Sequence, residues 1–175
     1  MRMRANSLLK IFFPMLILCG CRMDAPIPAV ENFELARYMG KWFEYARMPN
    51  WFEKDMTDVS VEYSIMPDGR VKVVNSGYRN GELKSITGVA EYTGKDGSGE
   101  LKVSFFRPFY SPYRIIKLSA DYRYSVVVSG KNYLWILSRE KTLTPEDRQE
   151  ITVFLQKNGF DTGKLIIRES TVTGR

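Results

Sequence analysis

Histidine is absent from this 175-residue chain, and its two cysteines stand at positions 19 and 21. Without histidine the chain lacks the usual general base and the most frequent metal ligand of proteins. Because no cysteine follows residue 21, a cysteine nucleophile, a disulfide or a Cys/His zinc site is excluded for the rest of the chain. These absences argue against most hydrolase mechanisms. We therefore predict a protein that is not an enzyme and that needs no cofactor and no metal.

Clustered positive charge is lacking as well. The net charge is +6, but the first twenty residues hold three basic side chains and no acid, so the remainder carries +3. Its lysines and arginines are scattered along the chain, and we expect no nucleic-acid partner. The N-terminal apolar run at 11–18 is too short to span a membrane, which takes about 20 apolar residues.

Residues 1–20 have the pattern of a secretory signal peptide, because basic residues precede a short apolar core. The Leu-Cys-Gly-Cys at 18–21 resembles the bacterial lipobox, whose last cysteine is lipidated after cleavage. This resemblance implies a lipid on Cys21, with a plain signal peptide or an N-terminal anchor helix as alternatives. Arg22, and not aspartate, follows that cysteine. In such lipoproteins this implies anchoring in the outer membrane, facing the periplasm.

The rest of the chain divides into three predicted parts. Residues 21–31 contain two prolines and are predicted to form a lipidated tether. Residues 32–169 have the length of a single domain. Residues 170–175 are predicted to form a C-terminal tail.

Within the domain, short segments rich in aromatic and β-branched residues alternate with turn residues. One turn is Asn80-Gly81, a strong signal for a two-residue hairpin. Strands are predicted near 40–48, 58–66, 70–79, 84–93, 99–106, 112–119, 124–129 and 133–138. Their short links indicate an all-β antiparallel meander. Closing it into a barrel would remove exposed edges and leave room for one small ligand, whereas a sandwich with a filled core is the alternative.

One amphipathic helix is predicted after these strands. It extends over about 14 residues from its cap at Thr144 to a stop at Gly159. Its apolar side chains are spaced three and four apart and form one stripe, which needs a surface to pack against. A last short strand is predicted at 165–168.

The first strand opens with Gly-x-Trp at 40–42, which resembles the signature of the lipocalin family. Two later features agree with it. An Asp-Tyr-Arg-Tyr segment lies between the sixth and seventh strands, with alanine where the family has threonine and its second tyrosine one residue early. An arginine follows the last barrel strand, where the family has one that stacks on the tryptophan. The signature residues are therefore Gly40, Trp42, Asp121, Tyr122 and Arg139.

The resemblance implies an eight-stranded antiparallel up-and-down β-barrel with one C-terminal helix. Its signature residues would close and brace one end of the barrel and would not contact ligand. Within the family the chain is most similar to bacterial outer-membrane lipocalins, with apolipoprotein D and plant temperature-induced lipocalins as relatives. The segments 101–106, 108–110 and 133–139 carry the same resemblance.

Aromatic residues gather on the predicted fifth, sixth and eighth strands. Period-two alternation there directs one set of apolar side chains inward. The resemblance implies fatty acids and lysophospholipids as ligands, with Tyr110 and Trp135 among the pocket positions. The predicted ligand-binding residues are Leu101, Val103, Phe105, Tyr110, Tyr113, Tyr133 and Trp135.

The roles of several polar and exposed residues near the open end of the predicted barrel, its mouth, are left open between two interpretations. The Tyr110 hydroxyl, Arg107 or Arg114 would bind an anionic head group, or the two arginines only solvate the rim. Glu44 is expected at the surface, with an inward acid as the alternative. The apolar segment 49–53 is expected to cover the mouth, while contact with a membrane or with a second protomer in a homodimer stays open.

Four functions remain open from the sequence. The leading one is a membrane-anchored carrier or store of lipids. The second is a carrier of another apolar ligand, such as a tetrapyrrole, a retinoid-like compound or a quinone. The third is a lipocalin-type enzyme, and the fourth is a structural envelope protein with a filled barrel.

We expect Cys21→Ala to abolish incorporation of labelled palmitate and to release the protein from membranes, because it removes the residue that would carry all acyl chains of the anchor. Cys19→Ala is the matched control, since it removes the neighbouring cysteine and leaves the lipidation site intact. Wild-type protein that stays unlabelled, or Cys21→Ala protein that stays with membranes, would show the lipobox interpretation to be wrong.

Overall fold

The computed structural model describes residues 27–94, 97–130 and 132–168. The predicted signal peptide, the lipidation site Cys21 and the predicted tail lie outside the described residues. The described strands are β1 (Gly40–Arg47), β2 (Met56–Ile65), β3 (Val71–Arg79), β4 (Glu82–Tyr92), β5 (Glu100–Phe106), β6 (Phe109–Leu118), β7 (Tyr124–Ser129), β8 (Tyr133–Ser138) and β9 (Ile166–Ile167). The described helices are α1 (Leu35–Tyr38), α2 (Pro145–Lys157) and the 3₁₀ turn η1 (Thr162–Lys164).

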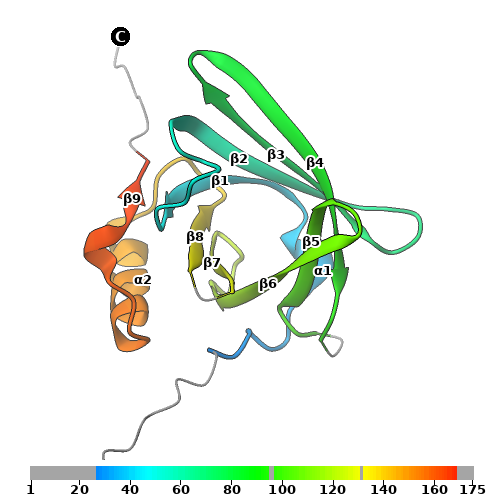
Figure 1. Ribbon diagram of the computed structural model, residues 1–175. Coiled ribbons are helices and arrows are strands. Elements are labelled where there is room, and N and C mark those ends of the chain that lie inside the picture. Colours follow the sequence, from blue (N-terminus) through cyan, green and yellow to red (C-terminus); the bar gives the residue numbers. More distant parts are fainter. Residues whose placement is uncertain (1–26, 95–96, 131, 169–175) are drawn as a thin grey trace, which may run out of the picture.

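The first eight strands form a closed antiparallel barrel (Figure 1). Each strand from β2 to β7 is hydrogen-bonded to the strand that follows it, and β1 pairs with both β8 and β2. The sheet therefore closes on itself and has no need of an edge strand. This confirms the predicted barrel and excludes the sandwich. The short strand β9 pairs with the far end of β1, at Ala46 and Arg47.

The two ends of the barrel are built differently. The β1–β2, β3–β4, β5–β6 and β7–β8 connections lie at one end, here named the mouth, and the other strand connections lie at the opposite end, the floor. Asn80 and Gly81 have φ values of 53° and 77° and form the predicted two-residue turn at the mouth. Helix α1, which was not predicted from the sequence, precedes β1 at the floor.

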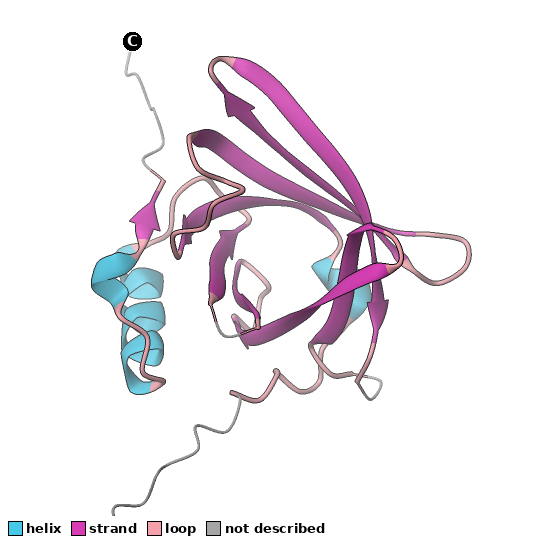
Figure 2. Cartoon of the chain, viewed as in Figure 1, coloured by secondary structure: helices cyan, strands magenta, loops and turns pink. Residues whose placement is uncertain are grey.

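Two hydrophobic clusters lie on opposite faces of the barrel wall. The inner cluster fills the floor end around Tyr38 and Trp42. The outer cluster packs Ile151 and Leu155 of α2 against residues of β1, β6, β7 and β8. Helix α2 consequently lies outside the barrel and covers one side of it (Figure 2). None of the helices in the described part of the chain has the length and hydrophobicity of a membrane-spanning segment.

Helix α2 begins as predicted. The Thr144 hydroxyl accepts a hydrogen bond of 3.1 Å from the backbone N–H of Asp147, and Pro145 is the first helical residue. The carboxylate of Asp147 is buried and accepts two hydrogen bonds from the Arg123 guanidinium, at 2.6 and 2.8 Å. This bidentate pair fixes the start of the helix to the β6–β7 turn.

Three signature residues meet at the floor. Gly40 has a φ of +89°, a conformation that favours glycine, and a Cβ there would lie 3.5 Å from Arg139 Nη1. The expected contact between Arg139 and Trp42 is present, with the guanidinium carbon 3.9 Å from the indole centroid. Arg139 also donates hydrogen bonds of 2.9 and 2.8 Å to the carbonyl oxygens of Lys41 and Arg37. The guanidinium therefore ties α1, β1 and the end of β8 together.

We expect Arg139→Ala to lower the free energy of unfolding by about 2–4 kcal/mol, because it removes a cation–π contact and two charge-assisted hydrogen bonds. Arg148→Ala on the exposed face of α2 is the matched control, and its effect should stay within about 0.5 kcal/mol. Urea unfolding followed by tryptophan fluorescence measures both variants. Equal stability of the two variants would contradict the bracing role of Arg139.

Candidate ligand-binding site

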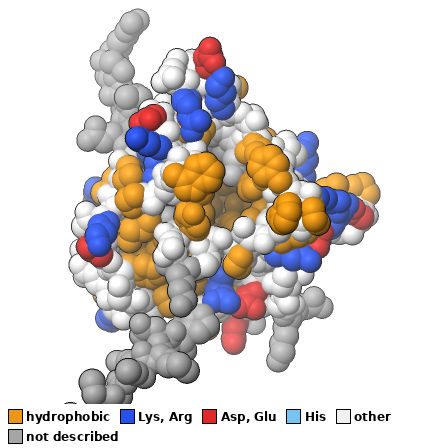
Figure 3. All heavy atoms as spheres, viewed as in Figure 1, with side chains coloured by type: hydrophobic (Ala, Val, Ile, Leu, Met, Phe, Trp, Pro, Cys, Tyr) orange, Lys and Arg blue, Asp and Glu red, His pale blue; other side chains and the backbone are white. Residues whose placement is uncertain are grey.

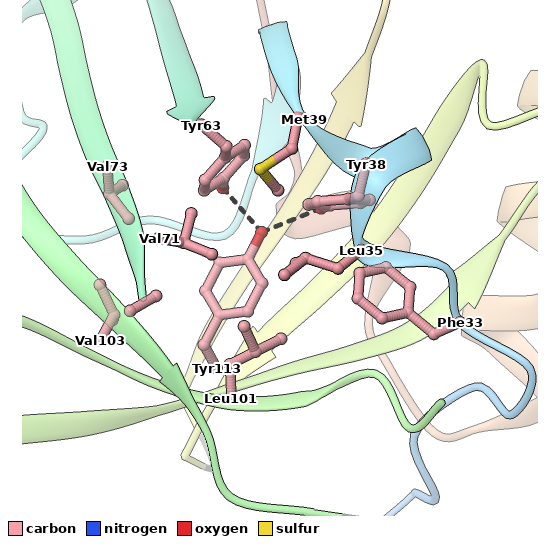
Figure 4. Close-up of a pocket in the computed structure, with 11 residues that line it drawn as sticks. Phe33, Leu35, Tyr38, Met39, Tyr63, Val71, Val73, Leu101, Val103 and Tyr113 are labelled. Atoms are coloured by element: carbon pink, nitrogen blue, oxygen red, sulfur yellow. Dashed lines mark hydrogen bonds between the residues drawn. The ribbon is translucent and has the colours of Figure 1, made fainter. Parts of the chain in front are cut away.

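Three tyrosine hydroxyls meet inside the barrel near its floor (Figure 4). The Tyr113 hydroxyl oxygen lies 2.9 Å from that of Tyr38 and 2.7 Å from that of Tyr63. The Tyr38 hydroxyl also lies 3.1 Å from the Ser125 hydroxyl. Burial raises the pKa of Tyr38 to about 12 and raises the pKa values of Tyr63 and Tyr113 well above the ordinary value. These hydroxyls therefore stay protonated and satisfy one another.

The space around the tyrosines is small. A cavity of about 10 Å³ remains between them and the apolar side chains of α1, β3, β4 and β5. Such a volume holds about one water molecule. Phe33, Leu35 and Met39 fill the floor from the α1 side (Figure 4). The floor end of the interior therefore has no room for a molecule larger than water.

Strand β5 forms one wall of the interior, as its alternation predicted. Leu101, Val103 and Phe105 all pack against the inner cluster. Val103 pairs with Ala90 and Leu101 with Tyr92 on β4, so these side chains share the inner face. Leu101 is buried at the floor end, whereas Val103 and Phe105 are only half-buried. Their accessible surface faces the interior of the barrel because the side chains point inward.

Aromatic side chains gather at the mouth. The rings of Tyr133 and Trp135 stack with centroids 6.0 Å apart, and Phe52 of the β1–β2 loop lies 5.5 Å from the first and 6.3 Å from the second. Hydrophobic side chains surround a hollow on this face of the molecule (Figure 3). Other large apolar side chains in the β1–β2 loop and at the strand ends next to the mouth are strongly exposed, namely Trp51, Leu83, Phe106 and Phe109.

Four charged side chains below the mouth form what we name the ion cluster: Glu44, Arg47, Glu53 and Arg168. Arg168 Nε donates a hydrogen bond of 2.9 Å to Glu44 Oε1. Arg47 Nε lies 3.4 Å from a carboxylate oxygen of each glutamate. The Glu53 carboxylate also accepts a hydrogen bond of 3.0 Å from Trp135 Nε1. When both glutamates are ionised, two cations balance two anions in a region with little access to water.

A β-bulge in β1 makes the ion cluster possible. The register of β1 against β8 shifts between Glu44 and Ala46. Glu44 pairs with Leu137 and Arg47 with Trp135, and both partners belong to the inner cluster. Ala46 belongs to the outer cluster instead. Glu44 points inward by alternation from Trp42, so the expectation of a surface Glu44 is wrong. The extra residue of the bulge turns Arg47 inward as well.

The ion cluster is incompletely hydrogen-bonded. Burial, and then the Glu53 carboxylate, raise the pKa of Glu44 to about 7 against the opposing effect of Arg168 and Arg47. Glu44 Oε2, Arg47 Nε and Arg168 Nη2 are buried and find no hydrogen-bond partner among the described residues. The two arginines consequently have donor capacity left for a further acceptor.

The prediction that Tyr110 lines the pocket is wrong. Its hydroxyl donates a hydrogen bond of 2.8 Å to Glu91, and the Lys102 ammonium lies 4.6 Å from its ring centroid. Glu91 and Lys102 are register partners on the face opposite to Val103. Tyr110 therefore lies on the outside of the barrel.

The two arginines predicted to meet a head group also lie away from the interior. Arg114 Nε donates a hydrogen bond of 3.0 Å to Glu100, its partner in the β5–β6 register, on the outer face. Arg107 is exposed in the β5–β6 connection. The arginines that the structure places beside the interior are Arg47 and Arg168 of the ion cluster.

The second signature segment forms a tight turn at the floor. Tyr122 has a φ of +63° and is buried, and its hydroxyl accepts a hydrogen bond of 2.8 Å from the backbone N–H of Glu34. Asp121 is exposed and accepts a hydrogen bond of 2.7 Å from Arg123. Both residues contribute to the structure of the floor and lie apart from the mouth.

The structure brings six of the seven predicted ligand residues to the inner face and leaves Tyr110 outside. Ligand contact by the six stays a prediction. Sequence reasoning missed Tyr38, Tyr63 and the ion cluster. Because Trp42 points inward, strand alternation predicts an inward Glu44 as well. The same rule predicts an outward Arg47, because the bulge after Glu44 cannot be read from the sequence.

The interior combines an apolar wall, three hydroxyls and two guanidinium groups. Hydrocarbon fits the wall, and an anionic or strongly polar group fits the arginines near the mouth. In residues 27–94, 97–130 and 132–168, no three His, Cys, Asp or Glu side chains gather in a way that would hold a metal ion. Such an interior is suited to a hydrophobic ligand.

Comparisons with known proteins agree with this architecture. A family model described as a lipocalin-like domain matches residues 33–170. Outer membrane lipoprotein Blc of Escherichia coli (strain K12) is 38% identical over 156 residues, which cover 86% of this chain and 88% of that protein. Apolipoprotein D of Rattus norvegicus is 32% identical over 153 residues, covering 81% of this chain and 79% of that protein.

A solved structure supports the fold. Insecticyanin from Manduca sexta superposes with a TM-score of 0.71 at 20% identity, covering 85% of this chain and 86% of that one. The family model spans all of the signature residues, and each of the two relatives covers more than four fifths of the chain. This chain therefore belongs to the lipocalin family.

Proposed function

We propose that this lipocalin binds a single-chain amphiphile, a fatty acid or a lysophospholipid, and holds or carries it at the bacterial outer membrane. The observation that carries the proposal is a set of inward-facing side chains that are only half-buried: Val103, Phe105, Tyr113, Tyr133 and Trp135. A barrel filled by its own side chains would bury them completely. Their accessible surface argues for a ligand-binding interior and against the filled-barrel alternative.

The gradient of polarity along the barrel supports an amphiphile over a wholly apolar ligand. The floor hydroxyls already bond to one another, so that end offers a saturated, largely apolar surface. The wall above it is hydrocarbon, and burying each methylene there is worth about 0.8 kcal/mol. The charged groups lie at the mouth end, with Arg47 beside Trp135. An acyl chain would enter first and leave its head group at the mouth.

Two observations support a location at the outer membrane. The relatives in Escherichia coli and Vibrio cholerae are both named as outer membrane lipoproteins. The predicted lipidation site Cys21 stands six residues before Ile27, the first described residue. Six extended residues reach roughly 20 Å, so a lipid on Cys21 would keep the barrel close to a bilayer. Lipocalins generally act as binding and transport proteins, and we propose no reaction for this chain.

Titration with a fluorescent fatty acid tests the proposal. We expect saturable binding, weakened about tenfold in Trp135→Ala because a large aromatic contact at the mouth is lost. Tyr110→Phe is the matched control, since it changes an aromatic residue on the outer face and should leave the dissociation constant unchanged. Absence of saturable binding for both a fatty acid and lysophosphatidylcholine would refute the proposed function.

A further inference from the structure

The β1–β2 loop, residues 48–55, places one anion inside the barrel. Glu53 is 8% exposed, whereas its neighbours Lys54 and Asp55 are exposed to solvent. Its Oε2 accepts hydrogen bonds from Trp135 Nε1 at 3.0 Å and from Asn50 Nδ2 at 2.6 Å. Burying a carboxylate is unfavourable unless it is paired, so this placement needs the partners it finds.

The Glu53 carboxylate lies where the head group of a ligand would lie. Arg47 and Trp135 are register partners on the inner face of β1 and β8, at the mouth end of the apolar wall. A carboxylate or phosphate at the end of an acyl chain needs a cation and an N–H donor at this level of the barrel. In this structure the Glu53 carboxylate of the β1–β2 loop is the anion that faces the Arg47 guanidinium and the Trp135 N–H.

Glu53 satisfies this site only in part. The distance of 3.4 Å between its carboxylate and Arg47 Nε is long for a charge-assisted hydrogen bond, and this Nε makes none with a described residue. A groove of about 620 Å³ runs between the loop and β9, and both Arg47 and Arg168 line it. The groove gives space for a head group larger than a carboxylate. The unpartnered N–H groups of Arg47 and Arg168 are themselves buried, and Arg47 donates hydrogen bonds to the carbonyl oxygens of Met48 and Glu53 in the loop. An external anion therefore reaches these donors once the loop has moved.

Charge balance links the loop to the ligand. If the loop moved away and took Glu53 with it, Arg47 would be left buried beside Glu44 and Arg168 with a net positive charge in the ion cluster. An uncompensated buried charge is strongly unfavourable. An incoming anion restores the balance of two cations and two anions, whereas a neutral head group does not.

We propose that Glu53 occupies the head-group site: in the loaded protein the anionic head of the amphiphile replaces the Glu53 carboxylate between Arg47 and Trp135, and the β1–β2 loop leaves the mouth. This inference rests on the proposed function and specifies its ligand class. The site selects amphiphiles with a carboxylate or phosphate over those with a neutral head, because only an anion exchanges with Glu53 at constant charge.

Three ligands with one acyl chain test the selectivity by calorimetric titration at pH 8: oleic acid, 1-oleoyl lysophosphatidic acid and 1-oleoylglycerol. We expect wild-type protein to bind both anionic ligands more tightly than the neutral one. Glu53→Gln removes the competing anion and should tighten binding of the anionic ligands by about tenfold, with little change for 1-oleoylglycerol. Arg47→Gln should abolish the preference. The two anionic ligands separate a carboxylate site from one that requires phosphate.

Glu62→Gln is the matched control, because it makes the same chemical change at an exposed position of β2. An identical ratio of anionic to neutral affinity in Glu53→Gln, Glu62→Gln and wild-type protein overturns the inference. Binding of all three ligands without preference also refutes it while leaving the proposed function intact. Failure of all three to bind refutes the proposed function itself.

Limited proteolysis of the wild-type protein gives a second readout that needs no variant. Trypsin cleaves after lysine, and Lys54 is the exposed neighbour of Glu53. We expect oleate to accelerate cleavage at Lys54 and 1-oleoylglycerol to leave it unchanged. Protection of Lys54 by oleate would show that the loop closes over the ligand, and this result also overturns the exchange.

Discussion

Strand β1 has to pair along both of its edges, and the other features of the barrel depend on how it does so. Its first half pairs with β2 and its second half pairs with β8 and β9, and Phe43 in the middle is paired with both β2 and β8. The same strand supplies Trp42 to the floor, two charges to the interior and Ala46 to the surface under α2. A regularly alternating strand would not reach all of these positions. The bulge after Glu44 reconciles them, since one extra residue reverses the side-chain direction and pairing with β8 resumes at Ala46.

The strands and α2 could be predicted because their signals are local. Period-two alternation, turn residues such as Asn80-Gly81 and the Thr144 cap act within a few residues of one another. Helix α1 has only four residues and leaves no periodic pattern. The Arg123–Asp147 pair, which fixes α2, joins residues 24 positions apart and depends on the tertiary fold.

Strand alternation correctly predicted which side chains of β5 and β8 face the interior. The family resemblance placed Tyr110 in the pocket without such a test, and the structure places it outside. Tyr113 and Tyr110 are three residues apart on β6, so a regular strand cannot direct both inward. With Tyr113 among the floor hydroxyls, Tyr110 has to lie outside, bonded to Glu91. The ion cluster posed a different difficulty, because it combines β1, a loop and β9. Buried ion pairs contribute little net stability to a fold. A role in ligand binding therefore explains the ion cluster at the mouth better than a role in stability.

The closed floor makes the barrel a blind tube. A ligand that enters with its acyl tail first has to leave with its head group first, along the same path. The depth of the tube is also fixed. From Leu101 at the floor to Phe106 at the mouth the wall extends over five residues, roughly 17 Å along the strand. Because barrel strands are tilted by about 35–45° to the axis, the depth of the tube is roughly 12–14 Å. A straight acyl chain longer than this depth must bend back on itself or hold its head outside. The tyrosines that close the floor therefore also limit the length of the acyl chain that the barrel can enclose.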